Sequence, residues 1–122
     1  SASANAKTTL YQCAVENVDP DGVRVNVIHS KGKLRANLIF GTTVSGTMYQ
    51  LNEIKNGYTG NIKNHPEYTI DLNISNKAGQ NTNIKGKKAH LNAMYPTELN
   101  AKGFDTIETD LICGEKISGS WN

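Results

Sequence analysis

The sequence predicts an all-β fold: a single antiparallel β-barrel or sandwich of about eight strands, closed by one disulfide. Three observations predict it. Apolar and polar side chains alternate over many short segments, turn-forming residues separate these segments, and the two cysteines lie near opposite ends of the chain. Alternation with a period of two is what a half-buried antiparallel strand requires. Many such strands joined by short turns are typical of small barrels and sandwiches.

The clearest alternation is in residues 67–74, where bulky apolar side chains occupy every second position. Residues 22–29 and 34–40 repeat the pattern, with valines in the first segment and leucines in the second. Five less regular segments are also expected to be strands. The predicted strands are residues 9–15, 22–29, 34–40, 43–51, 57–62, 67–74, 84–93 and 105–113.

Turn signals rich in Asn, Asp, Gly, Pro and Lys separate the predicted strands. They are residues 19–22, 30–33, 55–57, 64–66 and 76–79. One helical element competes with this pattern, because Thr97–Asn100 could form a single turn of helix before Gly103. The chain contains no linker, repeat or low-complexity tract.

At 122 residues the chain has the usual size of one domain. We expect the β-barrel domain at residues 9–118, a disordered N-terminal tail at 1–8 and a C-terminal tail at 119–122. A net charge of +2 and an aromatic content of 7% do not favour a nucleic-acid partner. No run approaches the ~18 to 20 apolar residues that cross a bilayer, so we expect no transmembrane segment.

The two cysteines, Cys13 and Cys113, each lie in a strand-like segment. In a reducing compartment they would be buried free thiols, and in an oxidising one they would pair. We expect a disulfide that joins the first strand to the last. In the chain-entropy model, closing a loop of about 100 residues stabilises a fold by up to about 4.7 kcal/mol.

The first residues, SASANAKTT, are small and polar. They resemble the sequence around a signal-peptidase cleavage site, although an ordinary loose terminus is the alternative. Together with the expected disulfide, they predict a protein made with a signal peptide and located outside the cell or in the periplasm, as part of the bacterial envelope.

Neither catalysis nor metal binding is predicted. His29, His65 and His90 have none of the spacings that bring histidines together, so we expect surface histidines and no metal site. Ser45 precedes Gly46 but lacks the leading glycine of a nucleophile elbow. We therefore expect no enzyme activity and no cofactor.

The densest positive cluster is residues 85–88, with lysines at three of four positions. Such a cluster is either a solvated hairpin end or a docking point for an acidic surface, because grouped cations speed encounter with anionic partners. Lys31, Lys33 and Lys77 from other predicted turns could extend it.

Three short motifs carry a family resemblance. They are Tyr11-Gln12-Cys13 with a partner cysteine near the end, Ser45-Gly46-Thr47-Met48-Tyr49, and Lys85-Gly86-Lys87-Lys88-Ala89-His90-Leu91. Together they resemble the periplasmic inhibitors of c-type lysozyme, small disulfide-closed β-barrels of bacterial envelopes. The gap between the second and third motifs is longer here than in that family.

In that family the serine and the lysine of the two loops enter the lysozyme cleft and engage its catalytic carboxylates. The resemblance therefore implies that Ser45 and Lys85 contact a lysozyme-like protein partner. The candidate partner-binding residues are Ser45, Tyr49, Lys85, Lys87 and Lys88.

Three classes of function follow. The first is a non-catalytic binding protein, in its most specific form an inhibitor of a c-type lysozyme-like enzyme. The second is a carrier that holds a small apolar ligand inside the barrel. The third is a structural or adhesive envelope protein, which would expose a sizeable apolar patch.

Overall fold

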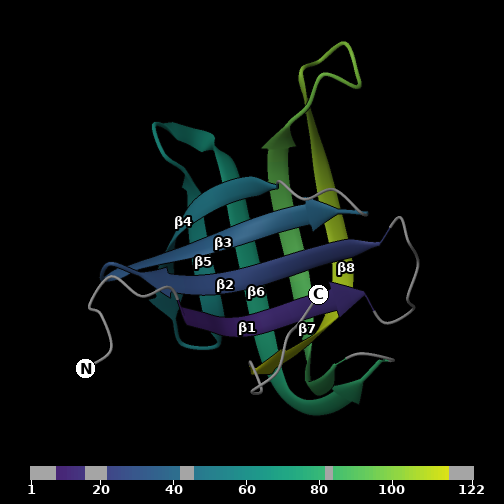
Figure 1. Ribbon diagram of the computed structural model, residues 1–122. Helices are drawn as coiled ribbons and strands as arrows, with labels where there is room; N and C mark the ends of the chain where they lie inside the picture. Colours follow the sequence, from purple (N-terminus) through teal and green to yellow (C-terminus); the bar gives the residue numbers. More distant parts are fainter. Residues whose placement is uncertain (1–7, 16–21, 42–45, 82–83, 116–122) are drawn as a thin grey trace.

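The computed structural model describes residues 8–15, 22–41, 46–81 and 84–115. These residues form a closed barrel of antiparallel strands, each next to the strand that precedes it in the chain (Figure 1). The strands are β1 Thr8–Val15, β2 Val23–Ser30, β3 Lys33–Phe40, β4 Thr47–Ile54, β5 Gly57–Ile62, β6 His65–Gln80, β7 Lys85–Pro96 and β8 Phe104–Glu115. The predicted all-β fold is confirmed, as a barrel rather than a sandwich. The predicted tails lie outside the described residues, except for Thr8, with which β1 begins.

The alternation of the sequence directs alternate side chains into the barrel. On β2, Val23, Val25 and Val27 are buried, as the pattern predicts. The β2–β3 turn consists of Lys31 and Gly32, which have φ angles of 53° and 74°. Positive φ at both central residues is what a type I′ turn requires, and its twist matches that of the strands it joins.

The interior of the barrel is filled by apolar side chains from every strand. The core consists of Cys13, Val23, Val25, Val27, Ala36, Leu38, Tyr49, Leu51, Tyr58, Ile70, Leu72, Ala89, Leu91, Ala93, Leu111 and Cys113. These side chains occupy the space in which a carrier would hold its ligand. Two grooves lined by described residues, one beside His90 and one beside Arg35, are open to solvent.

The disulfide between Cys13 and Cys113 is present, with an S–S distance of 2.07 Å. The two residues are direct partners in the β1–β8 ladder. The disulfide therefore joins the first strand to the last, as predicted, at the position where the barrel closes.

Strand β6 runs through residues 76–79, so the turn predicted there is wrong. Between Ile74 and Ala78 the pairing with β7 shifts, and three residues of β6 lie opposite Lys88 alone. The Ser75 hydroxyl spans this bulge, because it donates to the Lys88 carbonyl over 2.7 Å and accepts from the Lys77 amide over 3.2 Å. A bulge bends a strand without ending it, which explains the turn-like sequence.

Beyond the bulge, the end of the β6–β7 hairpin curls away from the barrel axis (Figure 1). We call residues 75–81 and 84–88 the arm. Gly79 of the arm packs against the outward-facing Ile112 of β8, which is buried. The Asn81 side chain donates to the Val15 carbonyl over 3.1 Å. These contacts hold the arm against the barrel.

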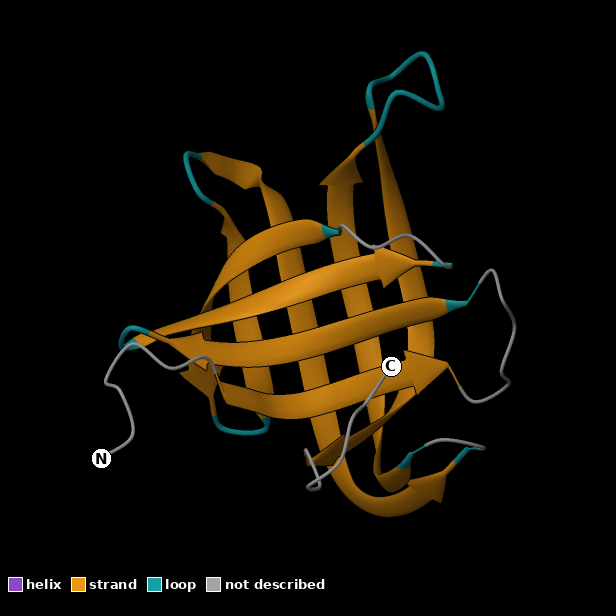
Figure 2. Ribbon diagram, in the orientation of Figure 1, coloured by secondary structure: helices purple, strands orange, loops and turns teal. Residues whose placement is uncertain are grey.

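The competing helical turn at Thr97–Asn100 does not form, since Figure 2 shows no helix in the described part of the chain. The β7–β8 connection is instead a loop closed by a 2.9 Å hydrogen bond from the Thr97 amide to the Gly103 carbonyl. The Asn100 side chain accepts from the backbone amides of Lys102 and Gly103. A side chain that bonds neighbouring backbone groups competes with helix formation.

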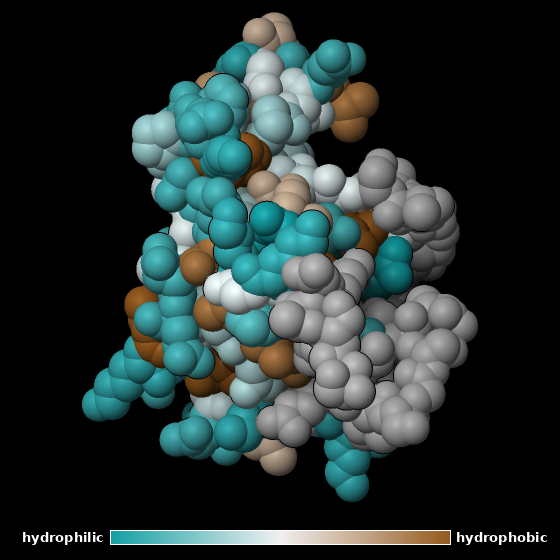
Figure 3. Space-filling view, turned by 60° about the vertical axis from the view of Figure 1, so that its left-hand side comes forward, coloured by the Kyte–Doolittle hydropathy of each residue, from teal (hydrophilic) through white to brown (hydrophobic). Residues whose placement is uncertain are grey.

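The surface carries no large apolar patch over the described residues. The exposed large hydrophobic side chains are Met48 and Ile54, on opposite ends of β4, and Leu99, in the β7–β8 loop. On the face seen in Figure 3, hydrophobic residues are scattered among hydrophilic ones. The described part of the surface therefore gives no support to a structural or adhesive role.

Candidate binding site

Lysines are concentrated at one end of the barrel. In a meander the connections alternate between the two ends, so the β2–β3, β4–β5 and β6–β7 connections share one end. Seven of the nine lysines in the described ranges lie in or beside these three connections. They are Lys31, Lys33, Lys55, Lys77, Lys85, Lys87 and Lys88. The other two, Lys63 and Lys102, lie at the opposite end.

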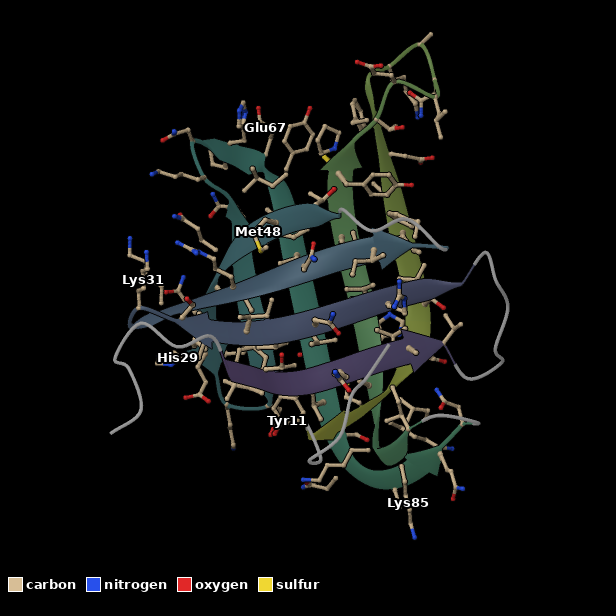
Figure 4. The ribbon with its side chains drawn as sticks, viewed as in Figure 1. Tyr11, His29, Lys31, Met48, Glu67 and Lys85 are labelled. Atoms are coloured by element: carbon tan, nitrogen blue, oxygen red, sulfur yellow. A yellow bond between two sulfur atoms is a disulfide. The ribbon has the colours of Figure 1, made fainter. Side chains whose placement is uncertain are left out.

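Four of the seven lysines are on the arm: Lys77, Lys85, Lys87 and Lys88. All four are exposed, and none of them forms an ion pair with the described residues. Figure 4 shows Lys31, beside the β2–β3 turn, and Lys85, at the start of β7, well apart from each other. The arm is therefore the densest cationic segment of this end, and its charges are not neutralised by described neighbours.

A groove of about 530 Å³ lies beside the arm. It is lined by Asn56, Asn73, Ile74, Ser75, Asn76, Lys88, Ala89, His90, Asp110, Leu111 and Ile112. Its volume is within the range of small-molecule sites. The lining is mixed, with amide, hydroxyl and charged side chains along a strip of apolar ones.

His90 on β7 borders this groove and is held by two carboxylates of β8. Its Nδ1 lies 2.8 Å from Asp110 Oδ1, and its Nε2 lies 2.9 Å from Glu108 Oε2. Carboxylates only accept, so both bonds form when both ring nitrogens carry a proton. The hydrogen bond to Asp110, followed by that to Glu108, raises the pKa of His90. Sequence reasoning identified His90 as a surface residue but missed its partners, because only the strand register brings the three together.

The structure corrects the expectation for Tyr49. This side chain is fully buried in the core, and its hydroxyl donates to the Met94 carbonyl over 2.7 Å. Burial raises the pKa of Tyr49 well above its ordinary value. A residue that is enclosed in this way packs the barrel and cannot contact a partner surface.

Ser45, the first residue of the Ser45–Tyr49 motif, lies outside the described residues. The motif's described part begins β4, whereas Lys85 begins β7. In the meander, β4 and β7 begin at opposite ends of the barrel, and Figure 4 shows Met48 and Lys85 far apart. The described parts of the two motifs therefore do not share one convex surface, whereas Lys85, Lys87 and Lys88 lie together on the arm.

Comparison of the chain with protein-family models, with curated proteins and with solved structures finds no match. Within the described ranges, no helix has the length and apolarity to span a membrane. The same residues contain no cluster of three or more His, Cys, Asp and Glu side chains arranged to hold a metal ion. What the described geometry offers is a cationic arm next to a groove rich in hydrogen-bonding groups.

Proposed function

We propose that this protein is a non-catalytic binding protein of a secreted or periplasmic compartment, and that its arm binds an anionic partner. The observation that carries the proposal is the set of four exposed arm lysines without an ion-pair partner among the described residues. Grouped cations raise the local potential and speed the approach of anionic surfaces.

The attachment of the arm supports the same proposal. Gly79 packs on Ile112, and Asn81 bonds to Val15, so the backbone that carries the lysines is held in place before a partner arrives. Binding then requires less ordering of the protein, and a larger share of the contact energy appears as affinity.

The disulfide supports the proposed location. A disulfide-closed barrel is compatible with an extracellular or periplasmic location, because disulfides persist in oxidising compartments and are rare in the cytosol.

Inhibition of a c-type lysozyme-like enzyme is the narrowest form of this proposal. In this fold it would depend on Lys85 and its neighbours on the arm, Lys87 and Lys88. A turbidity assay tests it: the rate at which a c-type lysozyme lyses bacterial cell walls is measured with and without an excess of this protein. Slower lysis in the presence of the wild-type protein, together with a normal rate of lysis in the presence of the Lys85→Ala variant, would support the inhibitor. Undiminished lysis would leave the broader proposal standing and remove this form of it.

The broader proposal is tested by capture from envelope and secreted fractions. The baits are the wild-type protein, a Lys85→Gln/Lys87→Gln/Lys88→Gln variant and a control with Lys63→Gln/Lys102→Gln at the opposite end. We expect an anionic partner that the wild type and the control retain at low salt and that the triple variant loses. Equal retention by all three baits would contradict the role of the arm.

A further inference from the structure

Three asparagine side chains on the groove have no hydrogen-bond partner in the described part of the chain. They are Asn56 in the β4–β5 turn, Asn73 on β6 and Asn76 in the bulge, and all three are exposed. By contrast, the Ser75 hydroxyl and the His90 ring in the same lining are already bonded. The groove therefore presents three unused amides at one site.

We infer that this groove binds an acidic oligosaccharide. The inference rests on the proposed function and names the chemical class of the anionic partner. Each sugar hydroxyl both donates and accepts a hydrogen bond, and each asparagine amide offers two donors and an acceptor. Three such amides around one groove match a ligand that carries several hydroxyls.

The apolar part of the groove lining suits the C–H groups on the face of a sugar ring. Ile74, Ala89, Leu111 and Ile112 contribute apolar surface beside the amides. A sugar ring has C–H groups on its faces and hydroxyls around its edge, so it can cover apolar surface while its edge meets polar groups. Ligand sites commonly combine an apolar lining with a few placed polar groups in this way.

The charges around the groove favour an acidic saccharide over a neutral one. Lys88 lies in the lining, and the register places Lys87 opposite Ala78, directly beyond the bulge. On the β8 side, Asp110 and Glu108 both bond the His90 ring, which compensates part of their charge when both of its nitrogens carry a proton. Anionic groups of the ligand would therefore face the arm rather than β8.

An extended peptide is the less suitable occupant. Many peptide sites add a strand to a free sheet edge, and this barrel is closed, with β1 paired to β8. At the bulge, the Ser75 side chain already occupies the Lys88 carbonyl and the Lys77 amide. The groove therefore offers side-chain amides rather than a row of backbone partners.

A glycan array of acidic and neutral oligosaccharides, probed with the labelled full chain, gives the first readout. Calorimetric titration then measures the affinity for the strongest array ligand, and for poly-L-glutamate of matched charge as a peptide probe. The variants are Asn73→Ala and Lys88→Gln, with Asn52→Ala, an exposed strand asparagine outside the groove, and Lys63→Gln as matched controls.

We expect binding to acidic glycans, weaker binding to neutral ones, and loss of about tenfold in affinity for each groove variant, as for the loss of one well-formed polar contact. Both controls should bind as the wild type does. Binding to poly-L-glutamate as tight as to the glycan, unaffected by Asn73→Ala, would overturn the saccharide inference and leave the proposed function intact. No binding to any glycan or to poly-L-glutamate would overturn both, and equal binding to neutral glycans would overturn the acidic class.

Discussion

Cys13 and Cys113 face each other across the β1–β8 ladder, with their Cα atoms 4.1 Å apart. Because these are the first and last strands, one covalent bond secures the position at which the two ends of the sheet meet. Elsewhere adjacent strands are joined by a short connection of the chain itself. The β1–β8 pair alone has no such connection, so the disulfide takes its place.

Replacing both cysteines with alanine should lower the free energy of unfolding by about 2 to 5 kcal/mol, as in other small disulfide-containing domains. Urea denaturation of the variant and of the oxidised wild type measures the difference. Without reductant, the wild-type mass should be lower than that of the reduced chain by two hydrogens. Labelling of both thiols in the native protein would contradict the disulfide.

Tyr49→Phe should destabilise the protein by about 1 kcal/mol, because it removes the hydroxyl that donates to the Met94 carbonyl. Tyr58→Phe is the matched control: Tyr58 is also buried, but its hydroxyl has no hydrogen-bond partner within the described structure. Denaturant midpoints of the two variants measure the comparison. If both changes had the same effect, the Tyr49 hydrogen bond would contribute nothing.

Gly86→Ala should destabilise the protein by about 1 to 3 kcal/mol, the usual cost of overpacking. An added Cβ would come within 2.8 Å of the Gly114 Cα atom and would also overlap the Cys113 carbonyl. Backbone atoms cannot move aside as a flexible side chain can. Urea denaturation measures the loss. As a control, Lys87→Ala at an exposed neighbouring position should leave the urea midpoint nearly unchanged. If Gly86→Ala had the same midpoint as Lys87→Ala, the arm could separate from β8 at little cost and the prediction would be wrong.

His90→Gln should reduce stability at low pH more than at high pH. The folded pKa of His90 is raised by Asp110 and Glu108, so the protonated ring contributes stability below its unfolded pKa, about 6.5. That contribution is lost as the pH rises through the folded pKa. The effect is small because the three side chains are largely exposed. Thermal unfolding at pH 5.5 and pH 9 measures it, and a stability difference independent of pH would contradict the pairing.

Period-two alternation predicted the strands well because most strands bury one face only. It also contained the information on Tyr49, which shares its face with the buried Leu51. The family resemblance assigned that tyrosine to a binding surface, although its position in the alternation predicts a buried side chain.

The bulge in β6 and the partners of His90 could not be predicted from the sequence. Residues 76–79 have the composition of a turn, and only the pairing with β7 shows that the strand continues. Likewise, His90 meets Glu108 and Asp110 because of the β7–β8 register, which depends on the packing of the whole barrel. The gathering of lysines at one end follows from the meander, so it could have been predicted once the strand order was known.

The central claim is that the arm forms one anion-binding surface. Amide chemical shifts of the isotope-labelled protein, followed during titration with a short oligo-glutamate, test it most directly. We predict that the largest shifts fall in residues 75–81 and 84–90, and that the resonances of Lys63 and Lys102 at the opposite end stay unchanged. Shifts spread evenly over all exposed lysines, or none in the arm, would contradict the account.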